Sequence, residues 1–431
     1  MDALINVLLI IFFGVLMLSI IVFVHEAGHF ATARLFGVRV QEFMIGLPGP
    51  SIGFTLKGTR FGVSPFLLGG YAKVAGMEGG KENPNLARAL AYISEMGTVE
   101  LAQVQEDEKQ LGFPLEEALD ILDIWGSIRR TRVRGGAYRY EIGELGSPSL
   151  GRPRTLLNPQ AALDEERKHT YRALPWFKRV IVLIGGVVFN LVFAILVFTA
   201  VLMVLGTQVP TTTFESVVEG APAAEAGLVA GDRILEVEGA EVASWDDFVA
   251  MVRTHEAGET IKVTVERDEV QLVYGVTLAA AEDGHPMMGV TTQAVRQPIS
   301  LWDALGTSFG FIGMVAQFIV MLFNPATFNE VIGQSSSVVG ISVEAKNAAL
   351  SGFLPFIVLA AALSISIGLM NLLPIPPLDG GKIVVETIER ITKRTIPVRV
   401  INGISIVGVG LFIMLFLFAT QQDIQRYFLG G

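Results

Sequence analysis

The sequence of 431 residues contains no cysteine. This absence excludes a disulfide framework, a thiol nucleophile and any metal site that uses cysteine ligands. A zinc ion, if the chain binds one, must therefore be held by histidine and carboxylate side chains. Histidine is scarce as well, because the whole chain has only five.

Charged residues are the second shortage. They make up 17% of the chain, against 51% hydrophobic residues, and the mean hydropathy is +0.53. This composition excludes an ordinary soluble globule and indicates a polytopic membrane protein with soluble parts. The net charge of -10 argues against nucleic acid as a partner.

Two histidines and a glutamate lie at the end of the first apolar segment. His25 and His29 are four residues apart, so on a helix they share a face and can reach one metal ion. Glu26 points to the neighbouring position, where it is suited to polarise a metal-bound water rather than to act as a third ligand. Residues 3–24 contain no ionisable side chain. Burying such groups in a membrane helix is costly unless they are paired or metal-bound, so the pattern predicts a metal site inside the membrane.

A buried acidic residue, Asp379, is expected after the apolar segment at residues 353–373. Three prolines within residues 374–377 end that helix. Unwound chain at membrane depth is tolerated only where it is buried in protein or lines a wet cavity. Asp379 would there complete a set of two histidines and one aspartate, with a fourth position left for water, as in a catalytic zinc site.

Basic residues decide the expected topology. They follow the first apolar segment, precede the second and follow Asp379, so all three places should face the cytoplasm and the N-terminus should lie outside. The segment 304–323 is also apolar enough to cross. Crossing there would put Asp379 on the opposite side from His25 and His29. We therefore expect 304–323 to lie along the outer face as a membrane-associated helix.

The segment between residues 206 and 298 has a different composition. Acidic residues outnumber basic ones by roughly three to one, as expected of an external domain. Residues 217–239 resemble PDZ domains, and a helix-like stretch at 245–252 and strands at 261–267 and 270–278 follow them. Such a domain either captures an extended peptide at a sheet edge or obstructs access to a site, and the sequence leaves both roles open.

The expected fold is a polytopic α-helical membrane protein with four transmembrane helices, a membrane-associated β-loop on the cytoplasmic side and one extracytoplasmic PDZ-like α/β domain. The expected order is transmembrane helix 1 (1–36), cytoplasmic β-region (37–79), cytoplasmic insertion (80–172), transmembrane helix 2 (173–206), PDZ-like domain (207–285), a region with the membrane-associated helix (286–351), transmembrane helix 3 (352–381), cytoplasmic loop (382–400), transmembrane helix 4 (401–420) and an external tail (421–431).

Taken in order, these features resemble the site-2 protease family, in particular its bacterial regulator-of-sigma-E (RIP metalloprotease) type. The resemblance rests on His25-Glu26-x-x-His29, Gly186-x-x-x-Asn190, the PDZ-like segment and Asn371-x-x-Pro374-x-Pro376-x-Leu378-Asp379-Gly380. It implies a zinc endopeptidase of the bacterial inner membrane that cuts a single-pass membrane protein, such as an anti-sigma factor, after another protease has trimmed it. Three departures are the single PDZ-like domain, Val187 in place of a proline, and the long insertion.

The resemblance also implies residue roles. One Zn²⁺ per chain would be bound by His25, His29 and Asp379, with Glu26 as general base. The residues expected at the substrate are Asn371, Gly69, Gly70, Tyr71, Asn190, Pro374 and Pro376. Asn190 could instead serve helix packing, and Asn371 could simply end its helix before the prolines.

Two other functions fit parts of the pattern. A zinc transporter would also place histidines in membrane helices, although it would need neither Glu26 nor a PDZ-like domain. A catalytically silent scaffold could bind membrane partners through the PDZ-like domain. Replacing Glu26 with glutamine separates these classes, because it should abolish cleavage and leave transport or scaffolding largely intact.

Overall fold

The computed structural model describes residues 2–67, 69–77, 83–133, 136–143, 150–281, 284–328, 331, 333, 336–394 and 396–428. The chain forms two compact units. The first comprises residues 1–198 and 306–431, and the second comprises residues 199–305. The last residues of the expected C-terminal tail, 429–431, lie outside the described part.

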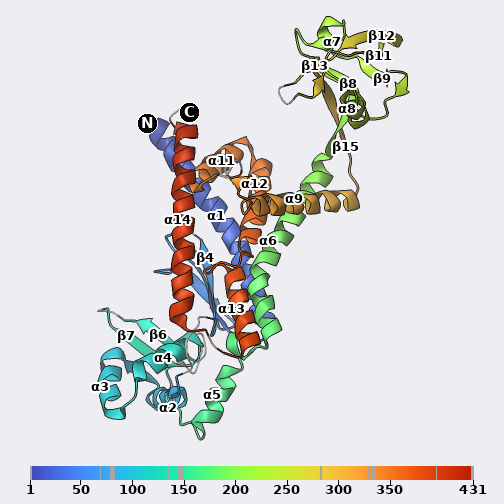
Figure 1. Ribbon diagram of the computed structural model, residues 1–431. Coiled ribbons are helices and arrows are strands. Elements are labelled where there is room, and N and C mark those ends of the chain that lie inside the picture. Colours follow the sequence, from blue (N-terminus) through green and yellow to red (C-terminus); the bar gives the residue numbers. More distant parts are fainter. Residues whose placement is uncertain are drawn as a thin grey trace. The chain divides into compact units, whose positions relative to one another are not determined.

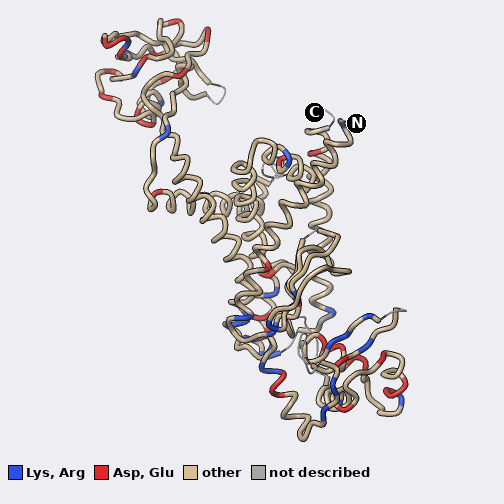
Figure 2. Tube along the Cα trace, turned by 180° about the vertical axis from the view of Figure 1, so that it is seen from behind, with Lys and Arg blue, Asp and Glu red and all other residues tan. Residues whose placement is uncertain are grey.

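Long apolar helices dominate the first unit. Five helices in the described part are long and apolar enough to cross a membrane: α1 (Asp2–Leu35), α6 (Trp176–Leu205), α9 (Leu301–Met321), α12 (Phe353–Met370) and α14 (Val398–Phe428). Charged residues gather mainly toward the ends of this helical body (Figure 2). These features confirm a membrane protein with several apolar helices, while the number of spans and their sidedness stay predictions.

The helices of the first unit do not all run in the same direction. Helices α1 and α14 run lengthwise, whereas α9 runs across them (Figure 1). Phe311 of α9 packs on Phe198 of α6, with ring centroids 4.9 Å apart. The crosswise direction is compatible with the expectation that this segment lies along a membrane face.

Glycines allow close packing around α1. A Cβ added at Gly28 would lie 2.1 Å from the carbonyl oxygen of Gly185 on α6. A Cβ added at Gly14 would lie 2.1 Å from Ser342 Oγ on α11 (Val338–Ser351). Because neither glycine has a side chain, the helices approach closely and α1 lies between its neighbours.

A four-stranded sheet follows α1. It has the order β2-β3-β1-β4, with β1 (Val40–Ile45) parallel to β3 (Thr59–Val63) and antiparallel to β4 (Gly70–Val74). The fourth strand is β2 (Ile52–Leu56). Strand β4 is therefore an edge strand, and it packs against α1.

The insertion folds around a hydrophobic core of its own. Its described elements are α2 (Leu86–Met96), β5 (Thr98–Glu100), α3 (Leu101–Leu111), α4 (Leu115–Ile124), β6 (Ile128–Arg132), β7 (Tyr138–Ile142) and α5 (Pro159–Arg167), followed by the 3₁₀ turn η1 (Tyr171–Ala173). The Lys73 ammonium on β4 lies 3.2 Å from the Asp123 carboxylate at the end of α4. The insertion thus contacts the edge strand through this ion pair.

The second unit contains the helix and strands expected of the PDZ-like domain. Its elements are β8 (Thr207–Val217), α7 (Pro222–Glu225), β9 (Arg233–Val237), β10 (Ala240–Glu241), α8 (Trp245–Arg253), β11 (Thr260–Arg267), β12 (Val270–Thr277), β13 (Ala279–Ala280), β14 (Pro286–Met287) and β15 (Val290–Gln297). The main sheet has the order β12-β11-β9-β8-β15. Because β15 pairs with β8, the compact unit continues past residue 285.

Candidate metal centre

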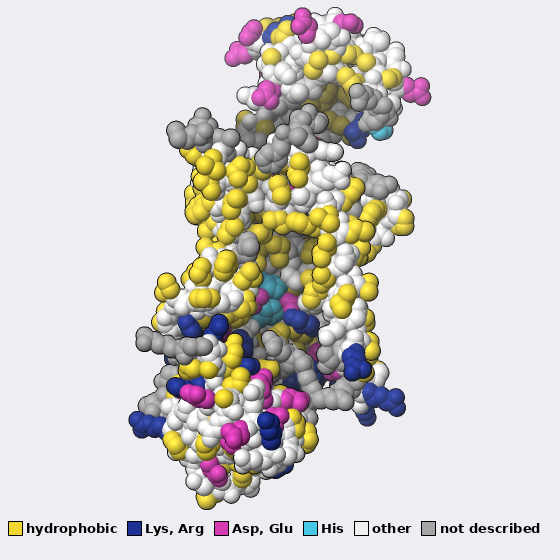
Figure 3. All heavy atoms as spheres, turned by 90° about the vertical axis from the view of Figure 1, so that its left-hand side faces the viewer, with side chains coloured by type: hydrophobic (Ala, Val, Ile, Leu, Met, Phe, Trp, Pro, Cys, Tyr) yellow, Lys and Arg dark blue, Asp and Glu magenta, His cyan; other side chains and the backbone are white. Residues whose placement is uncertain are grey.

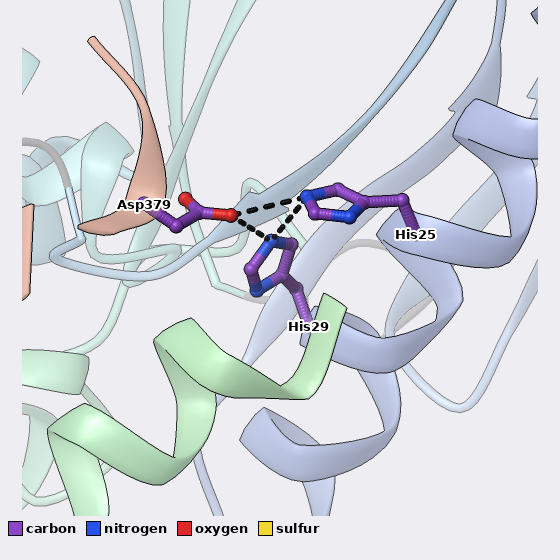
Figure 4. A group of neighbouring side chains, drawn as sticks. All are labelled: His25, His29 and Asp379. Carbon is purple, nitrogen blue, oxygen red and sulfur yellow. Dashed lines mark hydrogen bonds and ion pairs between the residues drawn. The ribbon is translucent and has the colours of Figure 1, made fainter. Parts of the chain in front are cut away.

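Three buried side chains meet beside α1 (Figure 4). Asp379 Oδ2 lies 3.0 Å from His25 Nε2 and 3.1 Å from His29 Nε2, and the two Nε2 atoms are 3.2 Å apart. A tetrahedral ion with bonds of about 2.0 Å needs ligand atoms about 3.3 Å apart. The triangle therefore has the size, the ligand types and the open fourth side that a zinc ion requires. Within the described part of the chain, no other group of this kind is found.

The far nitrogens of both imidazoles have partners. His29 Nδ1 lies 2.8 Å from the Val182 carbonyl oxygen, so this nitrogen carries the hydrogen and leaves the Nε2 lone pair free. His25 Nδ1 lies 3.4 Å from the side-chain amide of Asn190, whose Oδ1 is buried without a partner. Rotating this amide by half a turn lets Oδ1 accept the Nδ1 hydrogen of His25. Both histidines would then present an Nε2 lone pair that could bind a metal ion.

Gly186 gives the imidazoles their space. A Cβ added at this position of α6 would lie 2.7 Å from both His25 Cε1 and His29 Nε2. Any larger residue would displace the rings. The sequence pattern Gly186-x-x-x-Asn190 carried the family resemblance, but it did not indicate that Gly186 makes room for the two imidazoles.

Asp379 is the first residue of α13 (Asp379–Thr392). Its Oδ1 accepts a hydrogen bond from Lys382 Nζ at 3.0 Å, which leaves Oδ2 to face the histidines. The preceding loop is fixed by a hydrogen bond from the Gly380 N–H to the Asn371 carbonyl oxygen (2.7 Å). A Cβ at Gly380 would lie 2.2 Å from the Leu372 carbonyl oxygen. Lys382 is one of the basic residues that follow Asp379 and indicate the topology, and it also orients the carboxylate.

Glu26 lies outside the triangle and contacts β4. Its Oε2 accepts a hydrogen bond from the Ala72 N–H at 2.9 Å. Because the backbone groups of an antiparallel strand alternate in direction, the N–H and C=O of Ala72 both point away from β1, toward α1. The free edge of β4 thus faces the helix that carries His25, Glu26 and His29.

The other residues expected at the substrate lie in four places. Gly69 (φ +98°), Gly70 and Tyr71 lie at the start of β4, where the Tyr71 hydroxyl donates to Glu42 (2.7 Å). Burial and this carboxylate raise the pKa of Tyr71. Asn371 donates its side-chain amide to the Ile367 carbonyl oxygen on its own helix (3.0 Å). Pro374 and Pro376 lie in the loop before Asp379, and Asn190 contacts His25.

The site can be reached from the surface. Histidine and acidic side chains are visible at the bottom of a hollow that hydrophobic side chains border (Figure 3). A cavity of about 420 Å³ lies next to the site, with Ala72, Pro376 and Lys382 among its lining residues. Most of its lining is apolar, and Arg172 and Glu386 are among its few charged residues.

Comparison with known proteins identifies the family of the chain. Residues 13–416 match peptidase family M50. The chain is 29% identical to the zinc metalloprotease RasP of Bacillus licheniformis, covering 96% of this chain and 98% of that protein. It is 26% identical to the probable protease Eep of Enterococcus faecalis (96% and 98%) and 27% identical to the metalloprotease MmpA of Caulobacter vibrioides (96% of each).

Among solved structures, the PDZ domain of an SdrC-like protein from Listeria monocytogenes is 25% identical and covers 20% of this chain and 93% of its own, with a TM-score of 0.18. The family match, by contrast, spans nearly the whole sequence and includes both polar segments. The chain therefore belongs to peptidase family M50, the site-2 protease family of membrane metalloproteases.

Proposed function

We propose that this protein is a zinc-dependent intramembrane endopeptidase that cuts a single-pass membrane protein, such as an anti-sigma factor, within or near its membrane segment after prior trimming. The observation that carries the proposal is the triangle of His25, His29 and Asp379, with ligand atoms 3.0–3.2 Å apart and all three side chains buried. These residues would bind one zinc ion per chain. A bound zinc ion would polarise the scissile carbonyl and lower the pKa of a coordinated water.

Glu26 supplies the acid–base chemistry in this proposal. Its carboxylate accepts a proton from the attacking water and returns it to the leaving amine. In the structure this carboxylate accepts the Ala72 N–H. A peptide that pairs with the free edge of β4 would take that N–H in its place. Substrate docking would then release Glu26 for proton transfer.

The edge strand also addresses a difficulty that every helical substrate presents. The carbonyl groups of a membrane helix are bonded to N–H groups four residues later, and unwound chain in the membrane must find other partners. Strand β4, which begins at Gly70, offers such partners beside the metal ligands. Asn371 and the loop with Pro374 and Pro376 would border the same extended segment.

The PDZ-like unit would control which substrates reach the site. A groove of about 330 Å³ lies between α8 and β14, and its lining residues include Trp245, Phe248 and Met287. An apolar peptide end could bind there, or the unit could exclude untrimmed substrates by its bulk. In the topology that the basic residues predict, the PDZ-like unit and both termini are extracytoplasmic, and the metal lies near the cytoplasmic face of a bacterial inner membrane.

The decisive experiment compares four samples of purified protein on a trimmed single-pass membrane substrate. They are the wild type, the wild type treated with a zinc chelator, Glu26→Gln and the control Glu344→Gln, which makes the same change at an exposed position of α11. Only the wild type and the control should cut, and Glu26→Gln should still bind one zinc ion. Cleavage by Glu26→Gln would refute the proposal. Zinc binding without cleavage in any sample would favour a scaffold or a transporter.

A further inference from the structure

A strongly basic cleft lies apart from the metal triangle, at the far end of α13. Its volume is about 350 Å³, and it is lined by Arg172, Arg179, Glu389, Arg390, Lys393 and Arg394. Helix α13 begins with Asp379 and ends at Thr392, so the cleft and the metal ligand lie at opposite ends of one helix.

The cleft has more basic side chains than the neighbouring acidic side chains can neutralise. Arg172 pairs with Glu389 at 3.6 Å, and Arg179 pairs with Glu386 at 2.5 Å. The side chains of the remaining cations have no ion-pair partner among the described residues, and all three are exposed: Arg390, Lys393 and Arg394. The C-terminus of a helix carries about half a negative charge, which is too little to balance three cations. The cleft therefore favours an anionic ligand.

The position of the cleft indicates where that anion comes from. Arg179 lies in the first turn of α6, which starts at Trp176, and Arg394 lies just before α14, which starts at Val398. Both helices are long and apolar enough to cross a membrane. Tryptophan and basic residues at such helix ends mark the level of the lipid headgroups.

Helix α13 also exposes an apolar stripe, on a face turned away from Glu386 and Glu389. Val384, Ile388 and Ile391 are spaced at i, i+4 and i+7, so they share one face of the helix. Their exposed fractions are 39%, 42% and 75%. A water-facing helix would not expose three aliphatic side chains in a row, whereas a helix at a membrane interface lays such a face against acyl chains.

We propose that this cleft binds the headgroup of an anionic phospholipid, with the phosphate held by Arg390, Lys393 and Arg394 and the acyl chains lying along Val384, Ile388 and Ile391. The charge of the cleft selects an anion, and the exposed aliphatic side chains of the same helix favour one that carries hydrocarbon. Such a lipid would hold the distal end of the helix that presents Asp379. This inference goes beyond the proposed peptidase activity and does not depend on it.

Lipid binding to the purified full-length protein can be measured directly by native mass spectrometry. Phosphatidylglycerol should bind the wild type at least tenfold more tightly than phosphatidylcholine. Each basic residue near an anionic headgroup contributes roughly a fivefold gain in affinity. The combined variant Arg390→Gln, Lys393→Gln and Arg394→Gln should therefore bind phosphatidylglycerol about a hundredfold more weakly. Equal binding of the two lipids, or unchanged affinity in this variant, would overturn the proposal.

Matched variants separate the site from general charge effects. The control Lys109→Gln, Arg152→Gln and Arg154→Gln removes the same charge from exposed residues of the insertion, and it should leave the affinity within twofold. If this control lost affinity for phosphatidylglycerol as strongly as the cleft variant, the lipid would not bind at a local site.

Two further substitutions test whether acyl chains contact α13. This test remains valid even if the triple glutamine variant fails to fold. Ile388→Ser with Ile391→Ser alters only exposed side chains, and it should weaken phosphatidylglycerol binding while leaving the effect of the cleft cations intact. Inorganic phosphate should fail to displace the lipid at equal concentration. Displacement by phosphate, or unchanged lipid affinity in the serine variant, would assign the cleft to a free anion and refute the lipid.

Discussion

Gly186→Ala is the most informative single substitution, because it adds one methyl group at a defined place. That methyl carbon would lie 2.7 Å from His25 Cε1 and from His29 Nε2. Carbon atoms in contact prefer separations of about 3.5–4.0 Å. The rings or the helices must therefore shift by about 1 Å, in a site whose ligand atoms are only 3.0–3.2 Å apart.

The expected magnitude follows from this shift. Disturbing the residues that orient metal ligands weakens metal binding by about 10–100-fold, and a misplacement of 1 Å at a catalytic site costs about a hundredfold in rate. We therefore expect Gly186→Ala to lose at least tenfold in zinc affinity and about a hundredfold in peptidase activity. Alanine is the better helix former by about 1 kcal/mol, so reduced helix propensity cannot explain such losses.

Zinc affinity is measured by competition with a chromophoric chelator, and cleavage is measured on the same samples. Gly313→Ala on α9 is the control, because a Cβ there meets no atom within 4 Å. The control should retain wild-type affinity and activity. If Gly186→Ala retained both within twofold, the reasoning that the imidazoles need this space would be wrong.

Three further outcomes are expected. Asn190→Ala should weaken zinc binding about tenfold by removing the partner of His25, and Asn190→Asp should restore it, as chelator competition would show. Burial would by itself raise the pKa of Asp232, but hydrogen bonds from Arg267 and a backbone N–H outweigh burial and hold this pKa below its usual value. The Asp232–Arg267 pair should therefore stabilise the PDZ-like unit above about pH 4, and this stabilisation should be lost as the pH falls further. Hydrogen exchange of β9 in the full chain should rise on acidification in the wild type, and in Asp232→Asn it should be high already at pH 7. Asp423→Ala should lower the thermal stability by about 2 kcal/mol, because this buried carboxylate accepts two backbone N–H groups at the start of α11, whereas unchanged melting would deny it that role.

Much of the site could be predicted from the sequence because its signals are local. His25 and His29 are four residues apart on one helix, and helical geometry alone places them together. That Asp379 lies beside them could be predicted only indirectly, from the prolines that end a helix and from the basic residues that indicate its side of the membrane. The helix that begins at Trp245 and the two strands that follow it could likewise be predicted from local patterns.

Contacts between distant segments could not be predicted in the same way. The role of Gly186 depends on where α6 crosses α1, and that crossing depends on the packing of Gly28 against Gly185. The parallel pairing of β1 with β3 and the contact of Glu26 with Ala72 also depend on tertiary structure. The basic residues of the cleft on α13 are visible in the sequence, but there they indicate only the membrane topology. That they line one cleft depends on the tertiary structure.

The order of synthesis gives the metal triangle one more consequence. Asp379 is made 354 residues after His25. At about 10 residues per second, the ribosome needs on the order of half a minute to cover that distance. During this time the growing chain already has both histidines and Glu26 but not Asp379. If Asp379 is the third zinc ligand, as proposed, peptidase activity begins only when the C-terminal part of the protein has been made and has joined α1.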